Sequence, residues 1–123
     1  MQLTFLKAKL HRATVTAADM NYEGSISLDR VLCRAAGLSE FEQVDVYDIT
    51  NGARFTTYVI YGEPGQVQIN GAAARLVQPG DRVIVAAYVH LLPEEVARHA
   101  PRIVLLGEHN SIQATHQECI SQP

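Results

Sequence analysis

Two alternating stretches flank the dipeptide Asn51-Gly52, and together they predict a β-hairpin. In residues 43–50, Val44 and Val46 alternate with polar side chains, and residues 54–61 form the returning stretch. A period of two is typical of a strand with one buried face. Asn-Gly is the preferred pair in a type I′ turn, so we expect positive φ angles at both Asn51 and Gly52.

Four further segments have the residue pattern of strands. Residues 3–16 alternate, with Lys7, Lys9 and His11 on one face and apolar residues on the other. Residues 66–69, 82–90 and 103–106 are short runs between turns, and we expect 82–90 to be buried on both faces. This spacing predicts a mainly β protein, a small closed barrel of six to seven strands with two short helices.

The two helices are predicted from their end signals. Ser27 is a suitable N-cap for a helix over 28–36, with Val31, Leu32 and Ala35 as its buried stripe and a glycine at 37 to end it. The second helix begins at Pro93. Residues 17–24 show no period, so they are expected to form a loop that leads into the first helix.

Length and composition predict one domain. The chain has 123 residues, of which 47% are hydrophobic and 19% charged, as in ordinary globular proteins with a single core. We assign residues 1–107 to a single barrel domain. Residues 108–123 are polar and aperiodic, and we expect them to form a flexible C-terminal tail.

Several classes of protein and site are disfavoured. The net charge of -3 provides no basic surface for nucleic acid or an anionic membrane. The longest apolar run, 83–89, is too short to span a membrane, and the N-terminus lacks a signal-peptide pattern, so a cytoplasmic location is expected. Cys33 and Cys119 form neither a disulfide framework nor part of a metal-spaced cluster, so no metal site is expected.

Gly24-Ser25 is a candidate reacting pair. If the serine hydroxyl attacks the carbonyl carbon of Gly24, the amide becomes an ester, and elimination then breaks the chain. The dehydroalanine left behind hydrolyses to a pyruvoyl group and ammonia. Such a ketone forms a Schiff base with an amine and accepts electrons from a departing carboxylate. Taken alone, the pair is better explained as a turn before a helix.

Other residues would suit an acidic amino-acid substrate. Arg54 and Tyr58 lie four apart on one strand face, where a guanidinium can bind a carboxylate and a phenol can donate a proton. Thr57 should face the other way. Lys9 and His11 share a face of the first strand, and the charges of Lys9 and Arg54 would favour a dianion. Each residue, taken singly, also fits an ordinary exposed strand position.

Considered together, these segments resemble the aspartate 1-decarboxylase family in order and spacing. The resemblance covers residues 1–107 and rests on the following segments: Lys9-Leu10-His11-Arg12, Tyr22-Glu23-Gly24-Ser25, Asn51-Gly52, Arg54-Phe55, Thr57-Tyr58 and Asn70-Gly71-Ala72-Ala73-Ala74. It implies a double-psi β-barrel that cleaves itself between residues 24 and 25, turning Ser25 into a covalent pyruvoyl cofactor. It also implies conversion of L-aspartate to β-alanine and CO2, a step of pantothenate and coenzyme A biosynthesis.

The resemblance implies roles for individual residues and an assembly. Ser25 and Tyr58 would be catalytic, the latter as proton donor. The residues that would take part in processing are Gly24, Ser25, Thr57, His11 and Tyr22. Those that would bind substrate are Lys9, Arg54, Thr57, Asn70, Gly71, Ala72 and Ala73. The protein would be a homotetramer with sites between subunits, an arrangement that would let Thr57 take part. Whether a maturation partner is needed is left open.

Two other interpretations stay open at this point. The chain would be a non-catalytic binding or assembly module if it stays intact and Ser25 simply begins a helix. It would be a serine hydrolase if Ser25, His11 and an aspartate such as Asp19 formed a triad, although no Gly-x-Ser-x-Gly motif occurs.

Overall fold

The computed structural model describes residues 1–121, which form a mainly β domain with one nine-stranded sheet. Its strands are β1 (Leu3–Thr14), β2 (Ala17–Asp19), β3 (Ser25–Asp29), β4 (Gln43–Asp48), β5 (Arg54–Gly62), β6 (Val67–Asn70), β7 (Arg82–Leu91), β8 (Arg102–Leu106) and β9 (Ile112–Gln117). The helices are α1 (Arg30–Ala36) and α2 (Pro93–Val96), with 3₁₀ turns η1 (Gly71–Leu76) and η2 (Glu108–Asn110). Neither helix in this described part is long and apolar enough to cross a bilayer.

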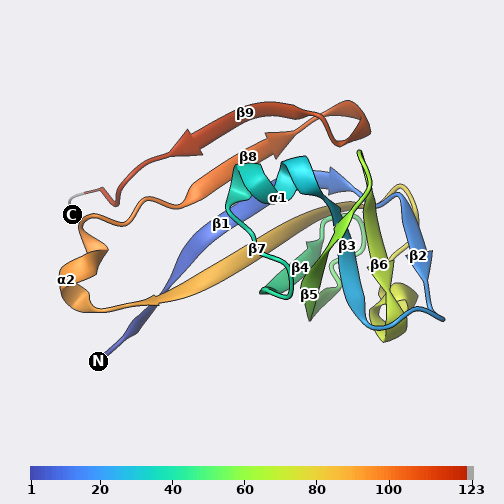
Figure 1. Ribbon diagram of the computed structural model, residues 1–123, viewed down its shortest axis with the longest axis horizontal. Helices are drawn as coiled ribbons and strands as arrows, with labels where there is room; N and C mark the ends of the chain where they lie inside the picture. The colour runs from blue at the N-terminus through green and yellow to red at the C-terminus, as the bar shows by residue number, and fades with distance from the viewer. Residues whose placement is uncertain (122–123) are drawn as a thin grey trace.

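The strands follow the order β2-β6-β3-β5-β4-β7-β1-β8-β9 across the sheet. Figure 1 shows β3, β5 and β6 at one end, and β1 and β7 extending away from them as an arm that carries α2. Apolar side chains from strands far apart in this order, among them Leu10, Ile26 and Val59, are completely buried in one core. The six strands predicted from the sequence are confirmed, with ends shifted by a few residues.

The first predicted helix begins too early. Residues 25–29 instead form β3, which pairs with β5 on one side and β6 on the other. A strand suits this segment because Ile26 and Leu28 alternate with polar residues and both are buried in the core. The N-cap is therefore Asp29, whose Oδ1 accepts from Val31 N at 2.7 Å, and not Ser27. The buried stripe moves accordingly to Leu32, Cys33 and Ala36, whereas Val31 is exposed.

The prediction of a frayed tail from residue 108 is wrong for most of that segment. Residues 112–117 form β9, which pairs antiparallel with β8. Five of its six side chains are exposed, so it is held by backbone pairing and shows no hydrophobic period. Together with β2 and β3, it raises the strand number above the predicted six to seven. Residues 122–123 of the predicted tail lie outside the described residues.

The hairpin exists, but its turn is not type I′. Gly52 has φ = 81°, whereas Asn51 is not among the residues with positive φ. Asp48 closes a longer loop instead: its side chain accepts from Thr50 N at 2.8 Å and Asn51 N at 3.1 Å, and its carbonyl accepts from Gly52 N at 2.8 Å. A side chain that satisfies the turn's backbone donors thus replaces the two-residue turn.

Two other expectations hold only in part. The strand predicted over 82–90 is buried through its middle, but Tyr88 and His90 are exposed on the arm. The second helix begins at Pro93 as predicted and ends at Val96. His99 lies beyond it and its Nε2 hydrogen-bonds the carbonyl of Leu6 at 2.6 Å.

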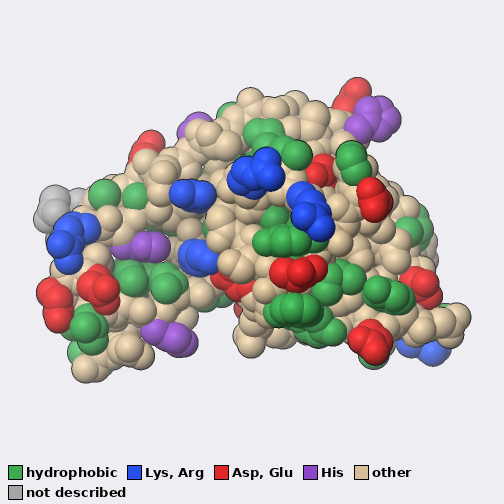
Figure 2. All heavy atoms as spheres, viewed as in Figure 1, with side chains coloured by type: hydrophobic (Ala, Val, Ile, Leu, Met, Phe, Trp, Pro, Cys, Tyr) green, Lys and Arg blue, Asp and Glu red, His purple; other side chains and the backbone are tan. Residues whose placement is uncertain are grey.

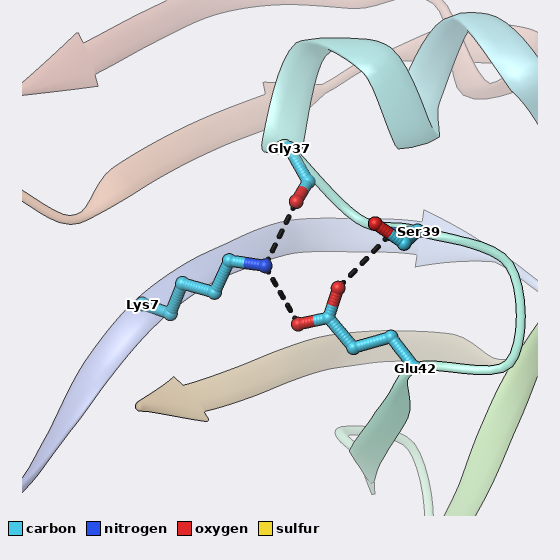
Figure 3. A network of polar contacts seen from close by, with 4 residues as sticks. All are labelled: Lys7, Gly37, Ser39 and Glu42. Carbon is cyan, nitrogen blue, oxygen red and sulfur yellow. Dashed lines mark hydrogen bonds and ion pairs between the residues drawn. The ribbon is translucent and has the colours of Figure 1, made fainter. Parts of the chain in front are cut away.

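A charged network ties the loop between α1 and β4 to the sheet. Figure 3 shows Lys7 reaching from β1 to this loop, where its Nζ donates to the Gly37 carbonyl at 2.9 Å and to Glu42 Oε2 at 2.7 Å. The other oxygen of Glu42 accepts from Ser39 N at 2.9 Å. These contacts fix residues 37–42, the loop that carries Glu40 and Phe41.

Candidate active site

Ser25 is the first residue of β3 and is almost completely buried, with 1% of its surface exposed. Its register partner on β6 is Asn70. The Ser25 hydroxyl accepts from Asn70 Nδ2 at 3.0 Å and donates to the Glu23 carbonyl at 3.0 Å. The hydroxyl therefore lies against the backbone of the residues that precede it, held on two sides by hydrogen bonds.

Gly71 makes the close approach that brings the next segment against Gly24. Gly71 has φ = 78°, and a Cβ there would lie 2.6 Å from Gly24 Cα and 2.8 Å from Gly24 N. Gly24 itself has no positive φ, and a Cβ added to it would meet nothing within 4 Å. A side chain is therefore excluded sterically at Gly71, whereas Gly24 has space for one.

A cavity of about 350 Å³ opens beside Ser25. It is lined by Tyr22, Glu23, Ser25, Glu40, Phe41, Tyr58, Ile60 and Tyr61. The structure thus brings together three of the predicted site residues, Ser25, Tyr22 and Tyr58. None of the lining residues is Lys or Arg, and two are glutamates.

Phe41 and Glu40 are cavity residues that the sequence did not indicate. Phe41 is 72% exposed, has φ = 71°, and its ring lies 6.4 Å from that of Tyr58. Its backbone N–H donates to the Val59 carbonyl at 2.7 Å, and Glu40 Oε2 accepts from Tyr61 N at 3.1 Å. Both belong to the loop tied down by Lys7, and an aperiodic loop gives no sequence signal for what it contacts.

Of the other predicted site residues, Gly24, Asn70 and Gly71 lie at Ser25, and the rest lie away from the cavity. Arg54, at the start of β5, has its guanidinium 4.3 Å from the centre of the Tyr47 ring. Lys9 lies on β1, three strands from β5 in the sheet, which is roughly 14 Å along the sheet. Thr57 pairs with the buried Val44, so it faces away from Tyr58 as expected. In η1, Ala72 is exposed and Ala73 packs partly against the core.

His11, next to Lys9 on the same face of β1, is partly buried. Burial is the main cause that lowers the pKa of His11, and the positive charges of Lys9 and Arg12 lower it further. Its Nδ1 is buried without a hydrogen-bond partner among the described residues. At neutral pH the imidazole is therefore mostly uncharged, which leaves Lys9 and Arg12 as the cations of this segment.

His11 and Ser25 do not form a catalytic pair within the chain. Among residues 1–121, the partners of the Ser25 hydroxyl are Asn70 and the Glu23 carbonyl. A serine nucleophile of the triad type needs a histidine within hydrogen-bond reach. The hydrolase interpretation therefore has no support from the geometry. The same residues contain no group of three potential ligands that could hold a metal ion.

A second hollow, of about 400 Å³, lies between the arm and β4. Figure 2 shows the molecule indented below the arm. The lining of this hollow includes Glu42, Asp45 and His90 and no Lys or Arg. Two carboxylates make this hollow unsuitable for an anion, and it contains none of the predicted site residues.

Comparisons with known proteins identify the family of the chain. The family model described as aspartate decarboxylase matches residues 1–113. A protein from Maricaulis maris named aspartate 1-decarboxylase is 56% identical over 119 residues, covering 95% of this chain and 98% of its own. Proteins of the same name from Caulobacter vibrioides and Clostridium beijerinckii are 58% and 52% identical, each over 92% of this chain and over 98% and 93% of their own lengths. The chain therefore belongs to the aspartate decarboxylase family of carboxy-lyases.

Proposed function

We propose that this protein is a self-processing, pyruvoyl-dependent decarboxylase that converts L-aspartate to β-alanine and CO2 for pantothenate and coenzyme A biosynthesis. The observation that carries the proposal is the placement of Ser25 in a chain of this family. Its hydroxyl is buried and bonded to the backbone two residues upstream, and it borders a cavity shared with Tyr58. A binding module with an intact chain would not need a buried serine with two hydrogen bonds in the wall of a cavity.

The residues around Ser25 fit the self-cleavage chemistry. The hydroxyl oxygen attacks the Gly24 carbonyl carbon, the carbon–nitrogen bond breaks, and the proton passes to the Ser25 nitrogen. Loss of the Ser25 Cα proton then expels the Gly24 carboxylate, and water releases ammonia from the remaining group. The side-chain amide of Asn70 donates one hydrogen bond to this oxygen and holds it during the attack. The resulting pyruvoyl group supplies a ketone that takes up the substrate amine and accepts the electron pair left by departing CO2.

Charge in and around the cavity supports a site completed by a second copy of the chain. Aspartate carries two carboxylates, yet the cavity lining holds Glu23 and Glu40 and no cation. Lys9 and Arg54, the predicted carboxylate ligands, are not among its lining residues. A neighbouring subunit can supply cations that this chain's own cavity lacks, in the homotetramer that we propose. Light scattering in solution, which gives the assembly mass, tests that part of the proposal.

We also propose that the sheet closes into a double-psi β-barrel. Two hydrogen bonds show that the segment after β1 connects the start of β7 to the start of β6. Val15 N donates to the carbonyl of Asp81, just before β7, at 2.9 Å, and Thr16 N donates to the carbonyl of Val67, the first residue of β6, at 2.8 Å. β2 then pairs in parallel with β6. These bonds support closure of the sheet into a barrel, because they connect β6 and β7, which are not neighbours in the strand order.

The experiment that tests the function is the intact mass of the denatured protein followed by an aspartate assay. Cleavage between residues 24 and 25, with the larger fragment one ammonia lighter than hydrolysis alone would give, supports the pyruvoyl group. Formation of β-alanine from aspartate by the same sample supports the activity. A chain that stays whole after prolonged incubation and shows no decarboxylation would support the binding-module interpretation instead.

Gly71→Ala should slow self-cleavage. An alanine at φ = 78° costs about 1 kcal/mol in backbone strain, and its Cβ must also push the Gly24 backbone away from its present position. We expect a lower free energy of unfolding in denaturant titrations and slower appearance of the two fragments by mass.

Gly52→Ala is the matched control for this variant. Gly52 has φ = 81°, but an added Cβ there meets nothing within 4 Å. This variant should carry about the same 1 kcal/mol of backbone strain, and so lose that much stability, but it should keep the wild-type cleavage rate. Equal cleavage rates in the two variants would show that the Gly71–Gly24 contact does not matter for processing.

A further inference from the structure

A row of three amide side chains runs along β6 to Ser25. Gln68 and Asn70 of β6, and Gln66 directly before it, alternate with apolar residues, so the three side chains lie on the same side of this segment. Gln66 Nε2 donates to Gln68 Oε1 at 3.2 Å, and Gln68 Nε2 donates to Asn70 Oδ1 at 2.8 Å. Asn70 is completely buried, and its Nδ2 donates to the hydroxyls of Ser25 and Ser27, at 3.0 Å each. We call these three residues the amide row.

The amide row has a fixed direction. An amide side chain can turn either its oxygen or its NH₂ toward a neighbour, but a backbone N–H can only donate. The backbone N–H of Glu63 donates to Gln66 Oε1 at 2.8 Å. Gln66 must therefore present its NH₂ to Gln68, and each following amide takes the same orientation. At the end of the row, the Ser25 oxygen receives an N–H and its own hydrogen points to the Glu23 carbonyl.

We propose that Gln66 and Gln68 are positioning residues for self-cleavage, which set the orientation of the Asn70 amide so that it donates to the Ser25 oxygen. This inference rests on the proposed function. As the hydroxyl loses its proton to attack Gly24, negative charge develops on its oxygen. An N–H donor stabilises that charge, whereas an amide oxygen in the same place would oppose it. Neither glutamine touches the reacting atoms, so both act through Asn70.

Gln68→Glu tests the direction of the amide row. The two side chains have nearly the same shape, but an ionised carboxylate can only accept hydrogen bonds. The Asn70 NH₂ would then turn toward residue 68 and its oxygen toward Ser25. Loss of a hydrogen bond to a charged group predicts cleavage slower by about 10- to 100-fold at pH 8, followed by mass. The rate should recover as the pH falls and the carboxyl gains a proton that it can donate to Asn70.

Two controls separate orientation from a merely structural role. Gln78→Glu makes the same chemical change at an exposed turn residue and should cleave like the wild type at each pH. Gln68→Met removes the hydrogen bonds without imposing an orientation, so its loss should be smaller and independent of pH relative to the wild type. All variants share the other ionisable groups next to β6. These are Asp19 on β2, Asp29 on β3, Glu63 between β5 and β6, and Arg75 on η1. Comparison at matched pH therefore cancels their titration.

Thermal melting checks that each variant is folded. If Gln68→Glu does not fold, Gln66→Glu imposes the same reversal one step earlier in the row. The proposal is supported if cleavage recovers at low pH in Gln68→Glu and shows no such recovery, relative to the wild type, in Gln68→Met or Gln78→Glu. Cleavage like the wild type at every pH, or a loss equal to that of Gln68→Met at every pH, would overturn it.

Failure of the proposed function gives a different result. In that case the wild-type chain itself stays whole, and the amide row is tested on this intact chain by NMR. The proposal then requires slow solvent exchange of the Asn70 side-chain NH₂ protons and faster exchange in Gln68→Met. The same exchange rate in both chains would overturn the fixed orientation.

Discussion

Ser25→Ala is expected to leave a single uncut chain of 123 residues and to reduce aspartate decarboxylation to the background rate. The variant lacks the oxygen that attacks Gly24, so neither the ester nor the pyruvoyl group can form. Its fold should persist, because Asn70 Nδ2 keeps its bond to Ser27 and the loss of the two Ser25 hydrogen bonds costs only about 2 kcal/mol. Intact mass, an aspartate assay and circular dichroism measure the three outcomes.

Ser27→Ala is the matched control. Ser27 lies on the same strand face, and its hydroxyl accepts from the same Asn70 amide at the same 3.0 Å distance as Ser25. A Ser27→Ala chain should therefore be cut and should make β-alanine. A Ser25→Ala chain that is cut between residues 24 and 25, or that decarboxylates aspartate, would rule out the pyruvoyl proposal.

The sequence predicted those strands that alternate and bury one face. β5 is an example, since its pairing with β4 through Val46 and Phe55 agrees with the period read from the sequence. β3 was missed because Ser27-Leu28-Asp29 has the local composition of a helix start. The Ser27 hydroxyl is instead bonded to Asn70, which is 43 residues away in the chain. β9 was missed because an edge strand with exposed side chains carries no hydrophobic period.

The site was predictable where one strand carries the residues and not where several elements meet. The shared face of Arg54 and Tyr58 follows from the period of β5, although only Tyr58 lines the cavity, and the resemblance selected Ser25. Asn70 was expected to bind substrate, but its buried amide contacts Ser25. Phe41 was not expected because its place beside Tyr58 depends on the loop held by Lys7. The placement of a side chain across elements depends on tertiary packing, which short-range patterns do not contain.

Tyr58→Phe is expected to cleave normally and to decarboxylate aspartate about 100- to 10,000-fold more slowly, as judged by kcat/KM, the range typical for loss of a general acid. The Tyr58 hydroxyl is not among the hydrogen-bond partners of Ser25, so the fragments should appear at the wild-type rate. Its ring lines the same cavity as Ser25, where, in the proposed mechanism, the carbanion left by CO2 takes up a proton. Tyr61→Phe removes a hydroxyl from the same cavity wall, but its ring is held beneath the Arg30 guanidinium at 5.0 Å, so its effect should be much smaller. An equal loss in both variants would assign the effect to the shape or polarity of the cavity, and undiminished turnover in Tyr58→Phe would remove Tyr58 from the role of proton donor.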